Sequence, residues 1–98
     1  MVDYIHPIKW IDPHGDNYSF HFFIARDGTS HISIDVAYRD LQRGMQMRGR
    51  SCALGFSFAL PYKAGIIKWN AYNDDRKTSI SQEAKKFAEK IAGLIVFA

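Results

Sequence analysis

Residues 18 to 38 read YSFHFFIARDGTSHISIDVAY, and this stretch decides the fold. Apolar and polar residues alternate on both sides of a polar break at Arg26-Asp27-Gly28. The apolar positions are Tyr18, Phe20, Phe22 and Ile24 before the break and Ile32, Ile34, Val36 and Tyr38 after it. A period of two is typical of strands with one buried face. The stretch therefore predicts a β-hairpin.

The length of the loop sets the register of this hairpin. A two-residue loop at Asp27-Gly28 would pair Phe22 with Ser33 and place the two apolar sets on opposite faces. A three-residue loop, with Gly28 in the left-handed conformation, keeps them on one face. We therefore predict the three-residue loop. The resulting pairs are Phe22 with Ile32, Phe20 with Ile34 and Tyr18 with Val36.

Further strands are predicted on both sides of this hairpin. Large apolar residues alternate with small ones from Cys52 to Leu60, which indicates a central strand whose small face lies under a helix or another backbone segment. We expect Pro61 to end that strand. A tight turn at residues 62–63 would lead into a returning strand from about residue 66 to 72. It would place Phe58 beside Ile67 and Phe56 beside Trp69. Residues 4–11 form a candidate edge strand.

The C-terminal part of the chain has the pattern of an amphipathic helix. Ser79 and Gln82 have capping-box spacing, and Glu83 falls in the first turn, where the helix dipole favours an acid. Apolar residues follow at helical spacing: Ala84, Phe87, Ala88, Ile91, Ala92 and Ile95. Two endings remain open, because Gly93 either ends the helix or lies within it.

These elements predict an α+β fold. We expect an antiparallel sheet of about four to five strands, either open or a partly closed barrel, packed against one C-terminal helix. A short helical turn is favoured near residues 39–48, with a loop or an edge strand as alternatives. The length of 98 residues and the hydrophobic content of 47% suit one domain spanning residues 1–98.

Composition also indicates the cellular compartment in which we expect the protein. The single cysteine, Cys52, cannot close an internal disulfide. The first ten residues do not resemble a signal peptide, and no run approaches the roughly 18 apolar residues of a membrane span. We therefore expect a soluble, cytoplasmic protein. No phosphate-binding loop, dinucleotide fingerprint or zinc spacing occurs, so no cofactor or metal is predicted.

Positive charge is concentrated in residues 39–50, which we call the arginine segment. Its four arginines and one aspartate give it a charge of +3, which equals the net charge of the whole chain. Guanidinium groups bind phosphate or carboxylate oxygens, so we predict a non-enzymatic module that binds nucleic acid or an acidic protein. The plainer alternative is a solvated connection between strands. The candidate binding residues are Arg39, Arg43, Arg48, Arg50, Gln42, Gln46 and, on a predicted exposed turn, Tyr62 and Lys63.

The polar face of the first hairpin supplies a catalytic alternative. The predicted register places His21 across from Ser33 and diagonal to His31. Two histidines can act as general base and acid in metal-independent cleavage of RNA. The plainer interpretation is that the outer face of an antiparallel sheet is usually polar. A third hypothesis is a small regulatory or inhibitor protein, of the kind mobile elements and phages encode, that binds another protein. An edge strand could also pair two copies of the chain.

One acidic turn precedes the hairpin. Asp12, His14 and Asp16 alternate in the sequence, as metal ligands can. The glutamate that a helix-loop-helix calcium site needs is absent, because Phe23 stands in its place. Asp-Pro and Gly-Asp-Asn are also ordinary turn sequences. We therefore predict a turn here.

Overall fold

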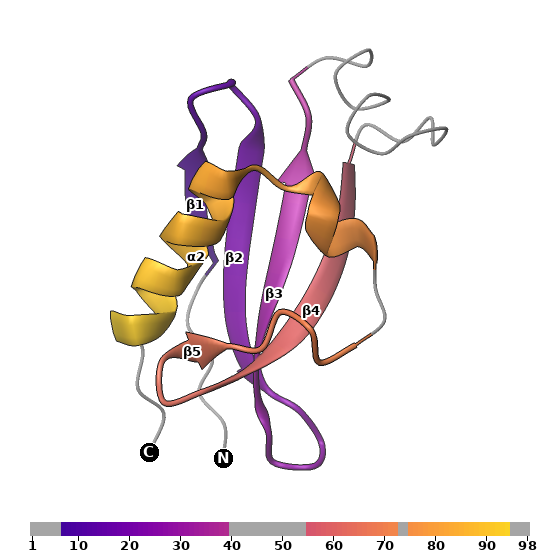
Figure 1. The fold of residues 1–98 in the computed structure, drawn as a ribbon, viewed down its shortest axis with the longest axis vertical. Coiled ribbons are helices and arrows are strands. Elements are labelled where there is room, and N and C mark those ends of the chain that lie inside the picture. The colour runs from indigo at the N-terminus through magenta and orange to yellow at the C-terminus, as the bar shows by residue number, and fades with distance from the viewer. Residues whose placement is uncertain (1–6, 40–54, 73–74, 95–98) are drawn as a thin grey trace.

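In the computed structural model, a curled antiparallel sheet wraps one side of a single helix (Figure 1). The structure describes residues 7–39, 55–72 and 75–94. Its five strands follow one another in chain order across the sheet. They are β1 (Ile8–Ile11), β2 (Asn17–Ile24), β3 (Ser30–Ala37), β4 (Gly55–Lys63) and β5 (Ile66–Ile67). A 3₁₀ turn, η1 (Asp75–Ser79), precedes helix α2 (Gln82–Leu94). The predicted α+β fold is confirmed.

The central hairpin has the predicted register. Tyr18 lies opposite Val36, Phe20 opposite Ile34 and Phe22 opposite Ile32. The backbone N–H of Ala25 donates to the carbonyl of Thr29 at 2.8 Å, which leaves residues 26–28 as the loop. Gly28 has a φ of +86°, the left-handed conformation that side chains with a β-carbon disfavour. The three-residue loop is confirmed.

The core lies between the inner face of this sheet and α2. Phe20, Phe22, Ile32 and Leu60 are fully buried. From the helix, Ala84, Ala88 and Ala92 bring the backbone close to the strands because their side chains are small. Phe87 of α2 stacks on Trp10 of β1, with ring centroids 4.7 Å apart. The predicted apolar face of the helix is confirmed over its described residues.

The β4–β5 hairpin differs from its prediction. Pro61 does not end β4, which continues to Lys63, and Tyr62 rather than Phe58 lies opposite Ile67. The turn is Ala64-Gly65, where both residues have positive φ. Pro61 is tolerated because its N and its carbonyl point to the same side of the strand. That carbonyl accepts the N–H of Lys68 at 2.9 Å, so no ladder bond to β3 is lost. The returning strand comprises only two residues.

Other boundaries also shift. The helix is capped by Ser81 and not by Ser79, and Gly93 lies inside α2, which extends to Leu94. The edge strand is present from Ile8, and residues 1–6 lie outside the described part. The small-residue face of β4 is not covered by a helix, since Ser57 is exposed. The helical turn predicted near residues 39–48 lies outside the described residues, apart from Arg39.

Among the described residues, no helix has both the length and the apolar character needed to cross a lipid bilayer.

Candidate binding site at the ends of β3 and β4

The arginine segment connects two strands that lie side by side. The chain leaves β3 at Ala37 and enters β4 at Gly55, and these two residues are paired across the sheet. The connection from residue 38 to residue 54 is far longer than the roughly 2–5 residues of most hairpin loops. The two strand residues that flank this connection, Ala37 and Gly55, therefore lie side by side at the same end of the sheet.

The first residues of this connection are held by long-range hydrogen bonds. The Tyr38 hydroxyl donates to the carbonyl of Ser79 at 2.8 Å. The backbone N–H of Arg39 donates to Oδ1 of Asp16 at 2.9 Å, and the Asp16 side chain is fully buried. The Arg39 side chain lies over Gly15, where an added β-carbon would come within 2.9 Å of its Cδ atom. Arg39 is thus an anchored residue at the start of the arginine segment.

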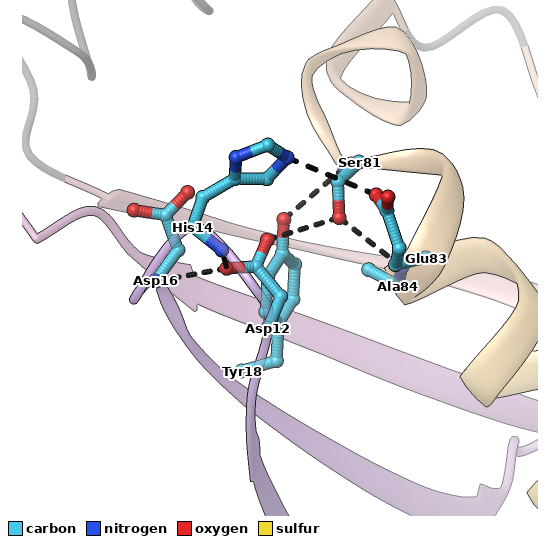
Figure 2. Close-up of polar contacts among 7 residues, drawn as sticks. All are labelled: Asp12, His14, Asp16, Tyr18, Ser81, Glu83 and Ala84. Carbon is cyan, nitrogen blue, oxygen red and sulfur yellow. Dashed lines mark hydrogen bonds and ion pairs between the residues drawn. The ribbon is translucent and has the colours of Figure 1, made fainter.

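Asp16 belongs to the turn between β1 and β2, which Asp12 organises (Figure 2). Oδ1 of Asp12 accepts the backbone N–H groups of His14 and Asp16, each at 2.9 Å. Both carboxylates are buried, and backbone amides satisfy part of their hydrogen-bonding capacity. This is the Asx-type turn chemistry expected of an aspartate before a proline.

The second carboxylate oxygen of Asp12 links this turn to the start of α2 (Figure 2). The Ser81 hydroxyl donates to Oδ2 of Asp12 at 3.0 Å and accepts the N–H of Ala84 at 3.1 Å. The backbone N–H of Ser81 in turn donates to the Tyr18 hydroxyl at 3.2 Å. Burial raises the pKa of the Tyr18 phenol, and its bonds with Ser81 act in the opposite direction. We call Asp12, Asp16, Tyr18 and Ser81 the anchor network.

The anchor network has the character of a structural site. His14 and Glu83 approach each other at its surface, with 3.9 Å between Nε2 and Oε1. The described residues contain no group of three acidic, histidine or cysteine side chains arranged to hold a metal ion. Its donors and acceptors are engaged with one another, so the turn interpretation of residues 12–16 fits the geometry.

The other predicted binding residues fall into two groups. Arg43, Arg48, Arg50, Gln42 and Gln46 lie outside the described residues. Tyr62 and Lys63 are described, and they lie at the other end of β4 from Gly55. Lys63 is exposed as expected, but Tyr62 is only 5% exposed because β4 continues past Pro61 and turns its ring into the core. The prediction that Tyr62 lies on an exposed turn was wrong.

The two histidines differ in their surroundings. His21 is half-buried and lies opposite Ser33, as predicted. His31 is 7% exposed, with Nδ1 3.1 Å from the carbonyl of Thr29 and Nε2 2.8 Å from the Tyr72 hydroxyl. Its ring also stacks with the rings of Phe23 and Tyr72, whose centroids lie 5.4 and 6.2 Å from its own. Because both ring nitrogens of His31 have partners within the protein, the geometry favours a packing role over proton transfer to a substrate.

Two residues of the anchor network, Asp16 and Ser81, are not predicted from the sequence in the roles that the structure gives them. The sequence predicts a turn at Asp16 but not its bond to Arg39, because the two residues are 23 positions apart in the chain. Ser81 precedes Ala84 with N-cap spacing, which is a usable signal, but Ser79 has the stronger capping-box pattern with Gln82.

Comparison with protein-family models, with curated proteins and with solved structures finds no match for this chain.

Proposed function

We propose that this protein is a non-catalytic binding module that engages an acidic partner, nucleic acid or an acidic protein surface, through the arginine segment. The observation that carries the proposal is the pairing of Ala37 with Gly55, which fixes both ends of a long, arginine-rich connection at one end of a sheet. Long connections on a rigid scaffold are where proteins commonly place binding residues.

Charge supports the same proposal. The chain outside the arginine segment has no net charge, so we expect the arginine segment to supply the attraction for an acidic partner. The backbone N–H of Arg39 is held by the buried carboxylate of Asp16, so we propose Arg43, Arg48 and Arg50 as the contacts. Arginine suits this role because its planar donors match phosphate and carboxylate oxygens. The proposed setting is the cytoplasm, where a single thiol stays reduced.

The test is fluorescence anisotropy with labelled single-stranded RNA, duplex DNA and polyglutamate. The test variant is Arg43→Ala/Arg48→Ala/Arg50→Ala. The matched control, Arg26→Ala/Lys86→Ala/Lys90→Ala, removes the same charge from exposed residues of the β2–β3 loop and α2. We expect the test variant to weaken binding by at least about tenfold and the control by no more than about twofold to threefold, because specific contacts outweigh net charge.

Each probe decides between classes of partner. Binding of RNA or DNA in preference to polyglutamate identifies nucleic acid, and the reverse identifies an acidic protein. Equal weakening in the test and control variants would show that net charge alone drives binding, which contradicts the proposal. Failure of every probe would also contradict it and would favour the regulatory or inhibitor alternative.

A further inference from the structure

A hollow of about 650 Å³ lies at the end of the sheet remote from Arg39. Three segments meet there, namely the β2–β3 loop, the β4–β5 turn and the last turn of α2. In Figure 1 the β2–β3 loop and the β4–β5 turn both lie at the lower end of the sheet, whereas β3 ends at the upper end. We call this hollow the hairpin pocket. Its polar lining residues include Thr29, Ser30, Tyr62, Lys63 and Lys68.

The hairpin pocket carries positive charge. Lys63 and Lys68 are both exposed, and within the described residues neither ammonium group forms an ion pair. Among the described residues that line the pocket, none is an aspartate or a glutamate. Asp27 is close in sequence, and its Oδ1 atom accepts the N–H of Thr29 at 2.9 Å, but Asp27 itself is not among the described lining residues. Two ammonium groups at one hollow, with no carboxylate among its described lining residues, would attract an anion.

The uncharged lining residues add hydrogen-bond donors and leave space for a ligand beside the loop backbone. Thr29 and Ser30 each contribute a hydroxyl group, whereas the hydroxyl of Tyr62 is buried. Gly28 has no side chain, and open space surrounds the position of its missing β-carbon. An anion could therefore approach the loop backbone closely.

We propose that the hairpin pocket binds the phosphate group of a small molecule. Lysine binds phosphate as a point charge, and a phosphate group carries a charge of about −1.5 to −2 at pH 7, so two ammonium groups match it better than they match a singly charged carboxylate. The volume falls within the range of about 300–1,000 Å³ typical of small-molecule sites. Two sources have this chemistry, inorganic phosphate and a phosphate ester. This site is independent of the arginine segment.

The test is a titration followed by ¹H–¹⁵N NMR at constant ionic strength. The probes are inorganic phosphate, a nucleoside monophosphate and acetate. We expect phosphate to shift the amide signals of Thr29, Ser30 and Gly65 saturably, with a Kd on the order of 1 mM. Tighter binding of the nucleoside monophosphate would identify an ester as the ligand, and equal binding would identify free phosphate. Equal shifts with acetate would overturn the assignment to phosphate.

Paired variants separate the site from general electrostatics. Lys63→Gln/Lys68→Gln should weaken phosphate binding by at least about tenfold, while Lys86→Gln/Lys90→Gln, with the same loss of charge, should change it by less than about twofold. Arg43→Ala/Arg48→Ala/Arg50→Ala should leave it unchanged, which distinguishes this site from the proposed function. No saturable shift, or equal weakening in all three variants, would overturn the proposal.

Discussion

At the scale of single residues, Ser81 joins three parts of the molecule through its hydrogen bonds, and the residues next to it in the sequence do not predict this role. Its hydroxyl caps α2 and binds Asp12, and its backbone N–H binds Tyr18. Replacing Ser81 with alanine would remove the cap and leave a buried carboxylate oxygen without that partner. We expect Ser81→Ala to lower the free energy of unfolding by about 2 kcal/mol, measured by urea denaturation.

Ser79→Ala is the matched control. In the described structure only the carbonyl of Ser79 forms a hydrogen bond, and alanine keeps that carbonyl. The expected loss is therefore below about 0.5 kcal/mol. A larger loss for Ser79→Ala than for Ser81→Ala would support the capping box predicted from the sequence and contradict the anchor network.

Tyr18 gives the anchor network a dependence on pH. Because burial raises the pKa of its phenol above the ordinary value of 10.0, the folded state favours the protonated form. The stability that depends on this group is complete below pH 10 and is lost as the pH rises through the higher folded pKa.

The measurement is urea denaturation between pH 8 and pH 11, comparing wild type with Tyr18→Phe. At pH 8 the variant should be less stable by about 1 kcal/mol, since the buried N–H of Ser81 loses its acceptor. Above pH 10 its stability should fall less steeply than that of wild type. Parallel curves for the two proteins would show that Tyr18 does not titrate as its burial implies.

At the scale of elements, the β4–β5 turn contains an unfavourable residue. Ala64 has a φ of 54°, a left-handed conformation that costs an L-residue about 1 kcal/mol. We expect Ala64→Gly to be neutral or stabilising by up to about 1 kcal/mol, because release of this strain competes with the greater freedom of glycine in the unfolded chain. Thermal unfolding followed by circular dichroism measures the difference.

Gly65→Ala should have the opposite effect. The φ of Gly65 is +78°, and an added β-carbon would lie 3.1 Å from the Cα atom of Gly93 in α2. We expect a loss of at least about 1 kcal/mol. If both substitutions behaved alike, the turn would not lie at residues 64–65.

The two hairpins show which elements can be predicted from the sequence. In β2–β3, the alternation of apolar and polar residues and the glycine in the loop predict the same register, because only that register places Phe22 and Ile32 on the same face. In β4–β5, Pro61 predicts the end of a strand, but β4 continues to Lys63. The structure keeps Pro61 within β4 because its carbonyl and its N face Lys68 and not β3. That geometry depends on a neighbouring segment, which local sequence does not specify.

At the scale of the whole molecule, the sheet and the helix follow from periodicity, but the contacts between them do not. The bond between Asp16 and Arg39 and that between Asp12 and Ser81 join residues 23 and 69 positions apart. No local pattern encodes such pairs. The candidate site was therefore predictable as a charged segment, while its anchoring at the end of β3 became visible only in the fold.

The most direct test of the proposed function is the salt dependence of binding to the nucleic acid or polypeptide probe that binds best. Each arginine that contacts a phosphate contributes about −0.7 to −0.9 to the slope of log K against log salt concentration. For a nucleic acid probe, Arg43→Ala/Arg48→Ala/Arg50→Ala should make that slope shallower by about two to three, whereas the Arg26/Lys86/Lys90 control should keep the wild-type slope. An unchanged slope in the arginine variant would contradict binding through the arginine segment.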